Sequence, residues 1–366
     1  FISASVTLSD DIIRLFPSLP RITPLGSSLS IVYYTAIKIW ANRSVAMTGF
    51  NYGNYFGPIE PLADAIRDGE ERCWGAGNEK NKIPHDYVLY LGCNVLRTVA
   101  LAEMINSILT SMGIDYVSLG GPSTCCGIIH HSKGDRDASE TLTENTLAKF
   151  KSYHPKAVLT YCPSCHAHMD YALLDAGISF DVPYLHVTEF IVENLDKLKF
   201  QKKVEKRVMF HGHSDDEQAR RDSEFARKIL QAVPGLEVID ATGEAIWGHD
   251  CGSLQISMLG LDKHKMLVNE LFEDARDEGV DAVAALYHSC YRNMCPAEDT
   301  HGVQLIHYTS LIMEALNLSL PKERYKDLLS AGDPEGTFSE LAPVAERRGL
   351  NKKRLRKSLN LHFGEK

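Results

Sequence analysis

The sequence lacks three features that would place it in a common class of proteins. Its best candidate for a membrane span, Ser30 to Ala41, is too short and contains Lys38. Its 39 Lys and Arg residues stand against 48 Asp and Glu residues, so the net charge is −9, whereas a nucleic-acid or anionic-membrane binder needs a basic surface. It completes no G-x-G-x-x-G, P-loop or serine-nucleophile motif. We therefore expect no membrane span and no nucleic-acid partner.

The size and composition indicate a folded chain of more than one domain. A length of 366 residues suits two or three domains. Hydrophobic residues at 44% and charged residues at 24% are typical of a globular protein rather than a disordered one. Residues Phe1 to Ser9 do not form a basic start followed by an apolar core, so no signal peptide is visible. We expect a cytoplasmic protein.

What the sequence does have is nine cysteines. The number is odd, and a chain of this length can bury a core without disulfide bonds. In a cytoplasmic protein, many cysteines are more often metal ligands or redox groups than disulfide partners. Their spacing therefore has to indicate their role.

An internal repeat runs through most of the chain. Four pairs of segments align in the same order, at offsets of 120 to 125 residues: Val88–Cys93 with Val208–His213, Cys126–Gly127 with Cys251–Gly252, Ala157–Met169 with Ala282–Met294, and Leu185–Ile191 with Ile306–Ile312. Four matches in order indicate two copies of one folding unit.

Each copy alternates short apolar runs, typical of strands, with helical patterns. The first copy has strand-like runs at 86–91, 116–119 and 157–161, and the second copy has them at 207–210, 237–239 and 282–287. This alternation predicts an α/β fold of two tandem Rossmann-like units with parallel sheets, in which ligands gather at the carboxyl ends of the strands. The predicted domains are an N-terminal extension (1–84), a first unit (85–205), a second unit (206–318) and a helical, basic C-terminal tail (319–366).

Five cysteines follow the three expected strands of the first copy: Cys93, Cys125, Cys126, Cys162 and Cys165. A structural zinc site uses four ligands in a tetrahedron. Five thiols, two of them adjacent in the chain, exceed that number, whereas an iron–sulfur cluster has several iron atoms to share them. The pattern therefore favours an iron–sulfur cluster.

The pattern Cys-x31-Cys-Cys-Gly-x34-Cys-x2-Cys resembles the cysteine-rich CCG domain of the B subunit of heterodisulfide reductases, a family that normally carries two such domains in tandem. The resemblance covers roughly residues 85–318. It implies that the five cysteines hold a noncubane [4Fe-4S] cluster, which cleaves or forms a disulfide by one-electron steps on a disulfide, thiol or persulfide substrate.

The resemblance also implies an oxidoreductase that works as one subunit of a complex. The implied partners are a ferredoxin-like subunit with cubane [4Fe-4S] clusters and a flavin-containing subunit. The chain itself has no Cys-x2-Cys-x2-Cys run, so an external electron relay is required. The subtype that we favour is the B subunit of a heterodisulfide-reductase-like sulfur-oxidation complex, whose sulfur substrate is bound to a lipoyl carrier.

The second copy departs from the cysteine pattern. His213, Asp250 and Tyr287 stand where the first copy has Cys93, Cys125 and Cys162, and histidines occur in the vacated loops (His211, His213, His249 and His288). One interpretation is a decayed repeat with buried thiols. The other, which we favour, is a rebuilt site that holds zinc or a second, histidine-ligated iron–sulfur cluster. Its expected ligands are His213, Cys251, Cys290 and either Cys295 or His288.

Other histidines have both a functional and a structural interpretation. His130, after the CCG turn, is a candidate to donate a proton to departing sulfur, although solvated loop histidines are common. His166 and His168 are weaker candidates for a Cys2His2 zinc site with Cys162 and Cys165. His186 and His307 recur before threonines in both copies, a pattern that predicts helix N-caps by Thr188 and Thr309.

Two alternative functions stay open at the level of the sequence. The chain could relay electrons in another complex, such as a respiratory dehydrogenase or an electron-bifurcating complex of the benzoyl-CoA reductase type, without touching a sulfur substrate. It could also be a zinc-stabilised interaction module in which the cysteines are purely structural.

Overall fold

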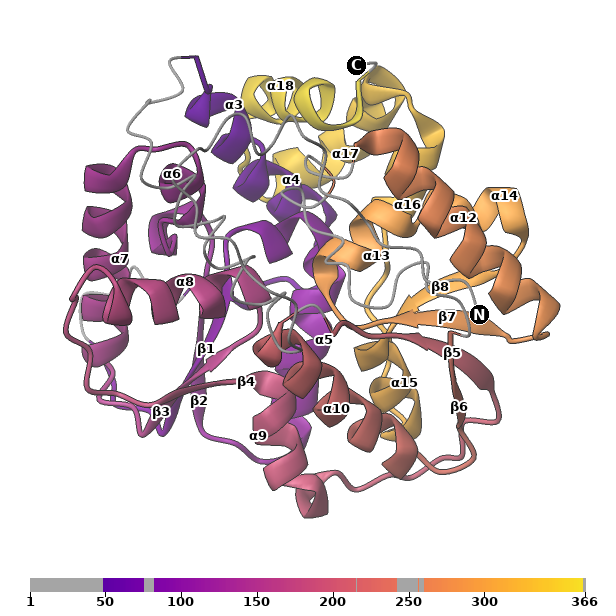
Figure 1. Cartoon of the computed structure of the whole chain (residues 1–366). Coiled ribbons are helices and arrows are strands. Elements are labelled where there is room, and N and C mark those ends of the chain that lie inside the picture. Colours follow the sequence, from indigo (N-terminus) through magenta and orange to yellow (C-terminus); the bar gives the residue numbers. More distant parts are fainter. Residues whose placement is uncertain (1–48, 76–81, 215, 242–255, 257–259, 365–366) are drawn as a thin grey trace, which may run out of the picture. The chain divides into compact units, whose positions relative to one another are not determined.

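A computed structural model describes residues 49–75, 82–214, 216–241, 256 and 260–364 (Figure 1). The two copies of the repeat belong to one compact unit. The division into four domains remains a prediction. None of the helices in the described ranges is long and apolar enough to cross a membrane.

The first copy forms a parallel four-stranded sheet. Its strands are β1 (Tyr87–Gly92), β2 (Tyr116–Gly120), β3 (Ala157–Thr160) and β4 (Tyr184–His186), in the order β2-β1-β3-β4. Residues 88–91 of the central strand β1 are fully buried, as expected for a strand covered by helices on both faces. The intervening helices include α5 (Val99–Ser111), α7 (Arg136–Lys151), α8 (Pro163–Leu174) and α9 (Val187–Glu193).

The second copy forms a separate sheet with the same strand order. Its strands are β5 (Arg207–His211), β6 (Glu237–Asp240), β7 (Ala282–Ala285) and β8 (Gln304–His307), in the order β6-β5-β7-β8. Its helices include α10 (Glu217–Ala232), α12 (Leu261–Asp277), α13 (His288–Met294), α14 (Ala297–His301) and α15 (Tyr308–Ala315). Two parallel sheets with one strand order confirm the predicted α/β fold of two Rossmann-like units.

The two copies pack together through equivalent helices. Helix α5 of the first copy contacts α15 of the second, and α9 of the first contacts α10 of the second. By position in the repeat, α5 corresponds to α10 and α9 corresponds to α15, so each contact repeats the other with the copies exchanged. The interface therefore follows the repeat, and it brings residues of the second copy close to the first.

The starts of α9 and α15 differ from the prediction in one respect. The N-cap residues are His186 and His307, not the threonines that follow them. In each case the imidazole Nδ1 accepts the threonine backbone N–H at 3.4 Å and lies 2.8 Å from the threonine hydroxyl. The expectation that Thr188 and Thr309 cap these helices was wrong, because the ring nitrogen reaches the free backbone N–H first.

The helices outside the repeat contact both of its copies. They are α3 (Tyr52–Phe56), α4 (Ile59–Ile66), α16 (Tyr325–Ala331), α17 (Pro334–Arg347) and α18 (Lys352–Phe363). Short helices inside the repeat are η2 (Asn94–Thr98), η3 (Pro122–Thr124), α6 (Ile128–Ser132) and η4 (Leu195–Lys197). The tail helix α18 contacts α17 and α4 (Figure 1). It buries Leu355, Leu359 and Phe363. The predicted helical tail is thus present.

Candidate metal centre

The five cysteines of the first copy are all buried at the carboxyl end of its sheet. Cys93 follows β1, Cys125 and Cys126 follow η3 after β2, and Cys162 and Cys165 lie at the start of α8 after β3. Each of the five is at most 6% exposed. Because adjacent parallel strands end at the same edge, their three loops meet there.

The five thiols form a continuous series of side-chain contacts. Cys93 hydrogen-bonds to Cys125, Cys125 to Cys126, Cys126 to Cys165, and Cys165 to Cys162. Within the described residues, no three of these five sulfur atoms form a group in which all atoms lie within 4.8 Å of one another. The group that does so is in the second copy. The five sulfur atoms therefore spread over more space than the ligands of a single ion occupy. This arrangement fits a group with several metal atoms.

If all five of these buried thiols are ionised, their negative charges need nearby positive charge. Hydrogen bonds from Cys126 and Cys93 lower the pKa of Cys125 to about 3, and a hydrogen bond from Cys165 holds the pKa of Cys162 well below its usual range. The hydrogen bond from Cys93 to Cys125, together with burial, raises the pKa of Cys93, and similar contacts raise the pKa values of Cys126 and Cys165. Buried thiolates repel one another, so ionising all five requires bound cations. The donor set therefore fits an iron–sulfur cluster.

The backbone around the adjacent cysteine pair is fixed by α7. Thr146 donates to the carbonyl of Cys125 at 2.8 Å, and Thr143 donates to the carbonyl of Cys126 at 2.7 Å. Gly127 donates its N–H to the Cys125 sulfur at 3.4 Å. Its φ is +93°, and a Cβ there would lie 2.5 Å from the carbonyl oxygen of Ser139. Only glycine fits this turn, which explains the third letter of the Cys-Cys-Gly motif.

His130 lies beside the thiol set, on α6. Its Nδ1 is 3.2 Å from a carboxylate oxygen of Asp135, and the ring of Tyr52 stacks on it at 4.0 Å. It interacts electrostatically with Cys125. The structure thus places His130 near the sulfur atoms, as a proton donor would require, and the role itself remains a proposal.

His166 and His168 point to hydroxyl groups rather than to the cysteine pair next to them. His168 Nε2 is 3.3 Å from the hydroxyls of Ser139 and Thr143, and His166 Nδ1 is 2.8 Å from the hydroxyl of Thr160. Within the part of the chain that the structure describes, they form no four-ligand set with Cys162 and Cys165.

Comparison with known families bears on the same stretch of chain. Residues 87–170 match the family described as CCG, "Cysteine-rich domain", and all five cysteines lie inside the match. Residues 87–170 form a CCG domain. The predicted resemblance is confirmed.

The relatives of the chain are reductase subunits. It is 25% identical to the D subunit of dihydromethanophenazine:CoB–CoM heterodisulfide reductase from Methanosarcina acetivorans, over 64% of this chain and 59% of that one. It is 24% identical to the Methanosarcina barkeri protein of the same name, over 73% and 66%. It is 27% identical to the B subunit of fumarate reductase (CoM/CoB) from Methanothermobacter marburgensis, over 45% and 32%. The match thus spans 59–66% of the length of the first two relatives.

A solved structure shares the fold. A hypothetical protein from Helicobacter pylori superposes with a TM-score of 0.55 at 11% identity, over 87% of this chain and 68% of that chain. At this identity the likeness supports the two-sheet architecture alone.

The structure adds contacts around the CCG thiols that the sequence did not indicate. Tyr90 on β1 is fully buried, and its hydroxyl donates to the carbonyl of Thr124 at 2.9 Å, directly before the cysteine pair. Tyr55 on α3 interacts electrostatically with Cys93, and burial raises the pKa of its phenol to about 12. His288 on α13 hydrogen-bonds to Cys162. Since His288 belongs to the second copy, a motif within one copy could not have revealed this contact.

The second copy gathers three side chains with metal-binding atoms. The ligand atoms of His211, His213 and Cys290 lie within 4.8 Å of one another, and all three residues are buried. Of the ligands expected from the sequence, His213 and Cys290 are thus brought together. Cys251 lies outside the described residues. Cys295 is buried apart from this group, with its thiol donating to the carbonyl of Arg292 at 3.4 Å.

Three buried histidines should make the stability of the protein depend on pH. Burial lowers the pKa of His168 and His186 to about 4 and that of His307 to about 3, whereas an unfolded histidine titrates near ~6.5. Between these values the unfolded chain binds protons that the folded chain excludes. The free energy of unfolding should therefore fall as the pH drops from about 6.5 to about 4, by up to roughly 3 kcal/mol per histidine.

Denaturant unfolding of the anaerobic protein at about pH 7, 6 and 5 measures this effect. The variant His168→Asn, which removes one of the three titrating rings, should show a smaller loss of stability over this interval. Equal stability of the wild type at both ends of the interval would contradict the prediction.

Proposed function

We propose that this chain is the iron–sulfur subunit of a multisubunit oxidoreductase that acts on sulfur groups. The observation that carries the proposal is the buried, continuous series of five thiols in the CCG domain. Cys93, Cys125, Cys126, Cys162 and Cys165 would hold a noncubane [4Fe-4S] cluster. Such a cluster supplies one-electron transfer and an iron site that can bind sulfur.

The reaction that suits this site is reduction of a disulfide or its reverse. A disulfide takes up two electrons and two protons, its S–S bond breaks, and two thiols result. The electrons arrive one at a time from outside the chain, and the protons must be delivered next to the sulfur atoms. A persulfide or a lipoyl disulfide on a carrier would react by the same balance.

The residues of the chain would supply the proton for this reaction and exclude water from the sulfur atoms. Asp135 holds Nδ1 of His130, so the opposite nitrogen, Nε2, is the atom from which a proton would pass to a nascent thiolate. Tyr52 fixes the plane of that ring by stacking. The buried loops exclude bulk water from the sulfur atoms, which strengthens electrostatic interactions there.

The electrons require partner subunits. The chain has no Cys-x2-Cys-x2-Cys run that would bind a cubane cluster of its own. We therefore propose a ferredoxin-like cubane [4Fe-4S] subunit as the immediate electron donor or acceptor and a flavin-containing subunit beyond it. The similarity to subunits of heterodisulfide and fumarate reductases supports an assembly of this kind.

A second candidate function is pure electron relay. All five thiols are at most 6% exposed, and a relay needs no substrate access. The two functions differ in whether a sulfur compound reaches the metal.

A spectroscopic titration separates these two functions. The anaerobically purified, oxidised protein is mixed with dihydrolipoamide, a dithiol, and its electron paramagnetic resonance spectrum is followed. If a substrate thiolate binds at the site, the g values should shift. The S-methylated dithiol, which cannot supply a thiolate, should leave them unchanged. An identical spectrum with both compounds would favour electron relay and contradict substrate binding.

A further inference from the structure

We propose that the second copy of the repeat binds one zinc ion through His211, His213 and Cys290. The assignment rests on the side chains of this copy and is independent of the cluster proposed for the CCG domain. His211 ends β5, His213 follows two residues later, and Cys290 lies on α13 after β7. All three therefore stand at the carboxyl edge of the second sheet.

The positions correspond to ligand positions of the first copy. By the offsets of the repeat, His213 takes the place of Cys93 and Cys290 takes the place of Cys165. The same loops thus present donor atoms in both copies, but the donors change from five thiols to two imidazoles and one thiol. Imidazole together with thiolate is a ligand set that zinc prefers.

The distances suit one ion. His213 Nε2 is 3.0 Å from Cys290 Sγ, and the three donor atoms lie within 4.8 Å of one another. In a tetrahedral zinc site with bonds of about 2.0–2.3 Å, two donor atoms are about 3.5 Å apart. A small outward movement of the side chains would therefore admit the ion.

The three side chains are buried together and contact one another. His211 is 3% exposed, His213 is 1% exposed and Cys290 is fully buried. His211 and His213 both hydrogen-bond to Cys290, so one thiol and two imidazoles already converge on one point, as the donors of a zinc site do.

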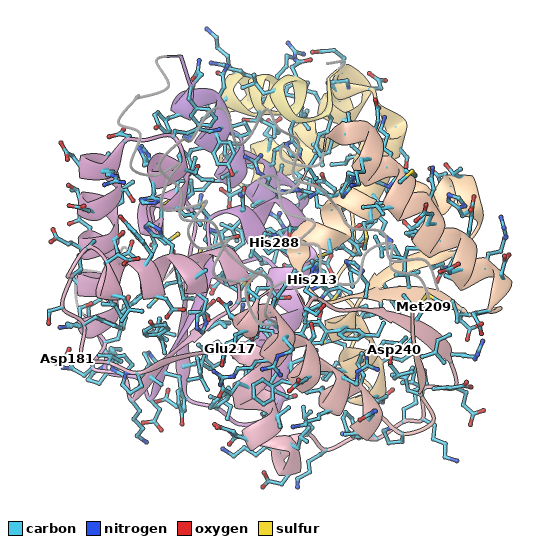
Figure 2. The ribbon with its side chains drawn as sticks, viewed as in Figure 1. Asp181, Met209, His213, Glu217, Asp240 and His288 are labelled. Atoms are coloured by element: carbon cyan, nitrogen blue, oxygen red, sulfur yellow. The ribbon has the colours of Figure 1, made fainter. Side chains whose placement is uncertain are left out.

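Neighbouring residues hold the ligands in place, as outer partners do in metal sites. The hydroxyl of Ser223 accepts the backbone N–H of His213 at 2.6 Å. Gly212, between the two histidines, permits this approach, because a Cβ there would lie 2.9 Å from that hydroxyl. Tyr287 stacks on the His213 ring at 5.1 Å and is itself anchored by a hydrogen bond of 2.9 Å to Asp222. Figure 2 labels His213, and His288 at the start of α13.

His264 is the described residue best suited to a fourth ligand position. It lies on α12, is 6% exposed and interacts electrostatically with both Cys290 and His211. Its Nε2 is buried, and within the described ranges it has no hydrogen-bond partner. A buried nitrogen without a hydrogen-bond partner that interacts with two of the three ligands is an independent sign that this space takes a cation.

Zinc has no redox chemistry, so the second copy would contribute stability rather than electrons. The ion would tie the end of β5 to α13. That helix also carries His288, which contacts Cys162 of the CCG domain. The ion would thereby hold the second copy in contact with the first site.

Metal analysis of the full-length chain tests this assignment. We expect about one zinc per chain in the wild type. In His213→Gln and Cys290→Ser, zinc retained after dialysis against a weak chelator should fall at least about tenfold, with the iron content unchanged. The matched controls are His301→Gln on α14, whose ring contacts Asn269, and Cys295→Ser, a buried cysteine outside the group. Both should keep their zinc.

A second readout uses the wild type, so it does not depend on a variant that folds. Cobalt bound in place of zinc should give thiolate-to-cobalt charge-transfer absorption, which Cys290→Ser should lose. Zinc-free wild-type protein that takes up no cobalt would overturn the assignment, and so would zinc retained in both variants. If zinc is absent and the iron content is normal, the zinc assignment fails and the proposed function stands. If iron is absent and the zinc content is normal, the proposed function fails and the zinc assignment stands.

Discussion

Cys125→Ala should empty the CCG domain of iron. Cys125 contacts both Cys93 and Cys126, so it joins the thiols of two loops, and its pKa of about 3 makes it a ready thiolate. Removing it separates Cys93 from the other three thiols. Iron and acid-labile sulfide per chain should fall at least about tenfold, and the visible absorption of the cluster should disappear with them.

Cys73→Ala is the matched control for this experiment. Cys73 is a partly buried cysteine outside the repeat, and burial raises its pKa to about 12. Its loss should leave iron and sulfide at the wild-type level. If Cys125→Ala retains full iron while its fold is intact by circular dichroism, the ligand set proposed for the first copy is wrong.

Gly92→Ala should cost both stability and iron, because this glycine lies against Cys165, one of the proposed cluster ligands. Gly92 ends β1 with φ at +70°, and a Cβ there would lie 2.8 Å from the Cys165 sulfur. The left-handed backbone alone costs about 1 kcal/mol with alanine. The contact would in addition displace Cys165, so we expect iron to be lost as well as a lower free energy of unfolding.

Gly113→Ala separates these two effects. Gly113 has nearly the same φ, +69°, but nothing lies within 4 Å of the position of its Cβ. It should lose about 1 kcal/mol of stability and keep its iron. If the two variants have the same iron content, the contact between position 92 and Cys165 does not matter for the metal.

The sequence predicted the architecture because the repeat supplied each strand twice. Val88 and Val208 start matching buried segments, and the same strand order appears in both sheets. The five thiols could also be predicted, since their loops follow adjacent parallel strands and must meet at one edge. For these residues, local pattern and overall topology agree.

The sequence did not reveal the contacts between the two copies of the repeat. It also did not reveal which histidines cap helices and which group with a cysteine. His288 reaches Cys162 from the other copy, and the packing of α5 on α15 and α9 on α10 brings the copies together. The imidazoles of His186 and His307 cap helices, which depends on the orientation of a ring rather than on residue type. His211 joins His213 because Gly212 lets the strand end pack against Ser223, a feature that spacing alone does not express.

The most direct test of the account is the iron and acid-labile sulfide content of the wild-type chain, purified without oxygen. A noncubane [4Fe-4S] cluster on the five CCG thiols predicts about four iron atoms and about four sulfides per chain, with visible absorption that bleaches on exposure to a chelator and oxygen. A colourless chain that contains zinc but no iron, with the five cysteines intact, would contradict it.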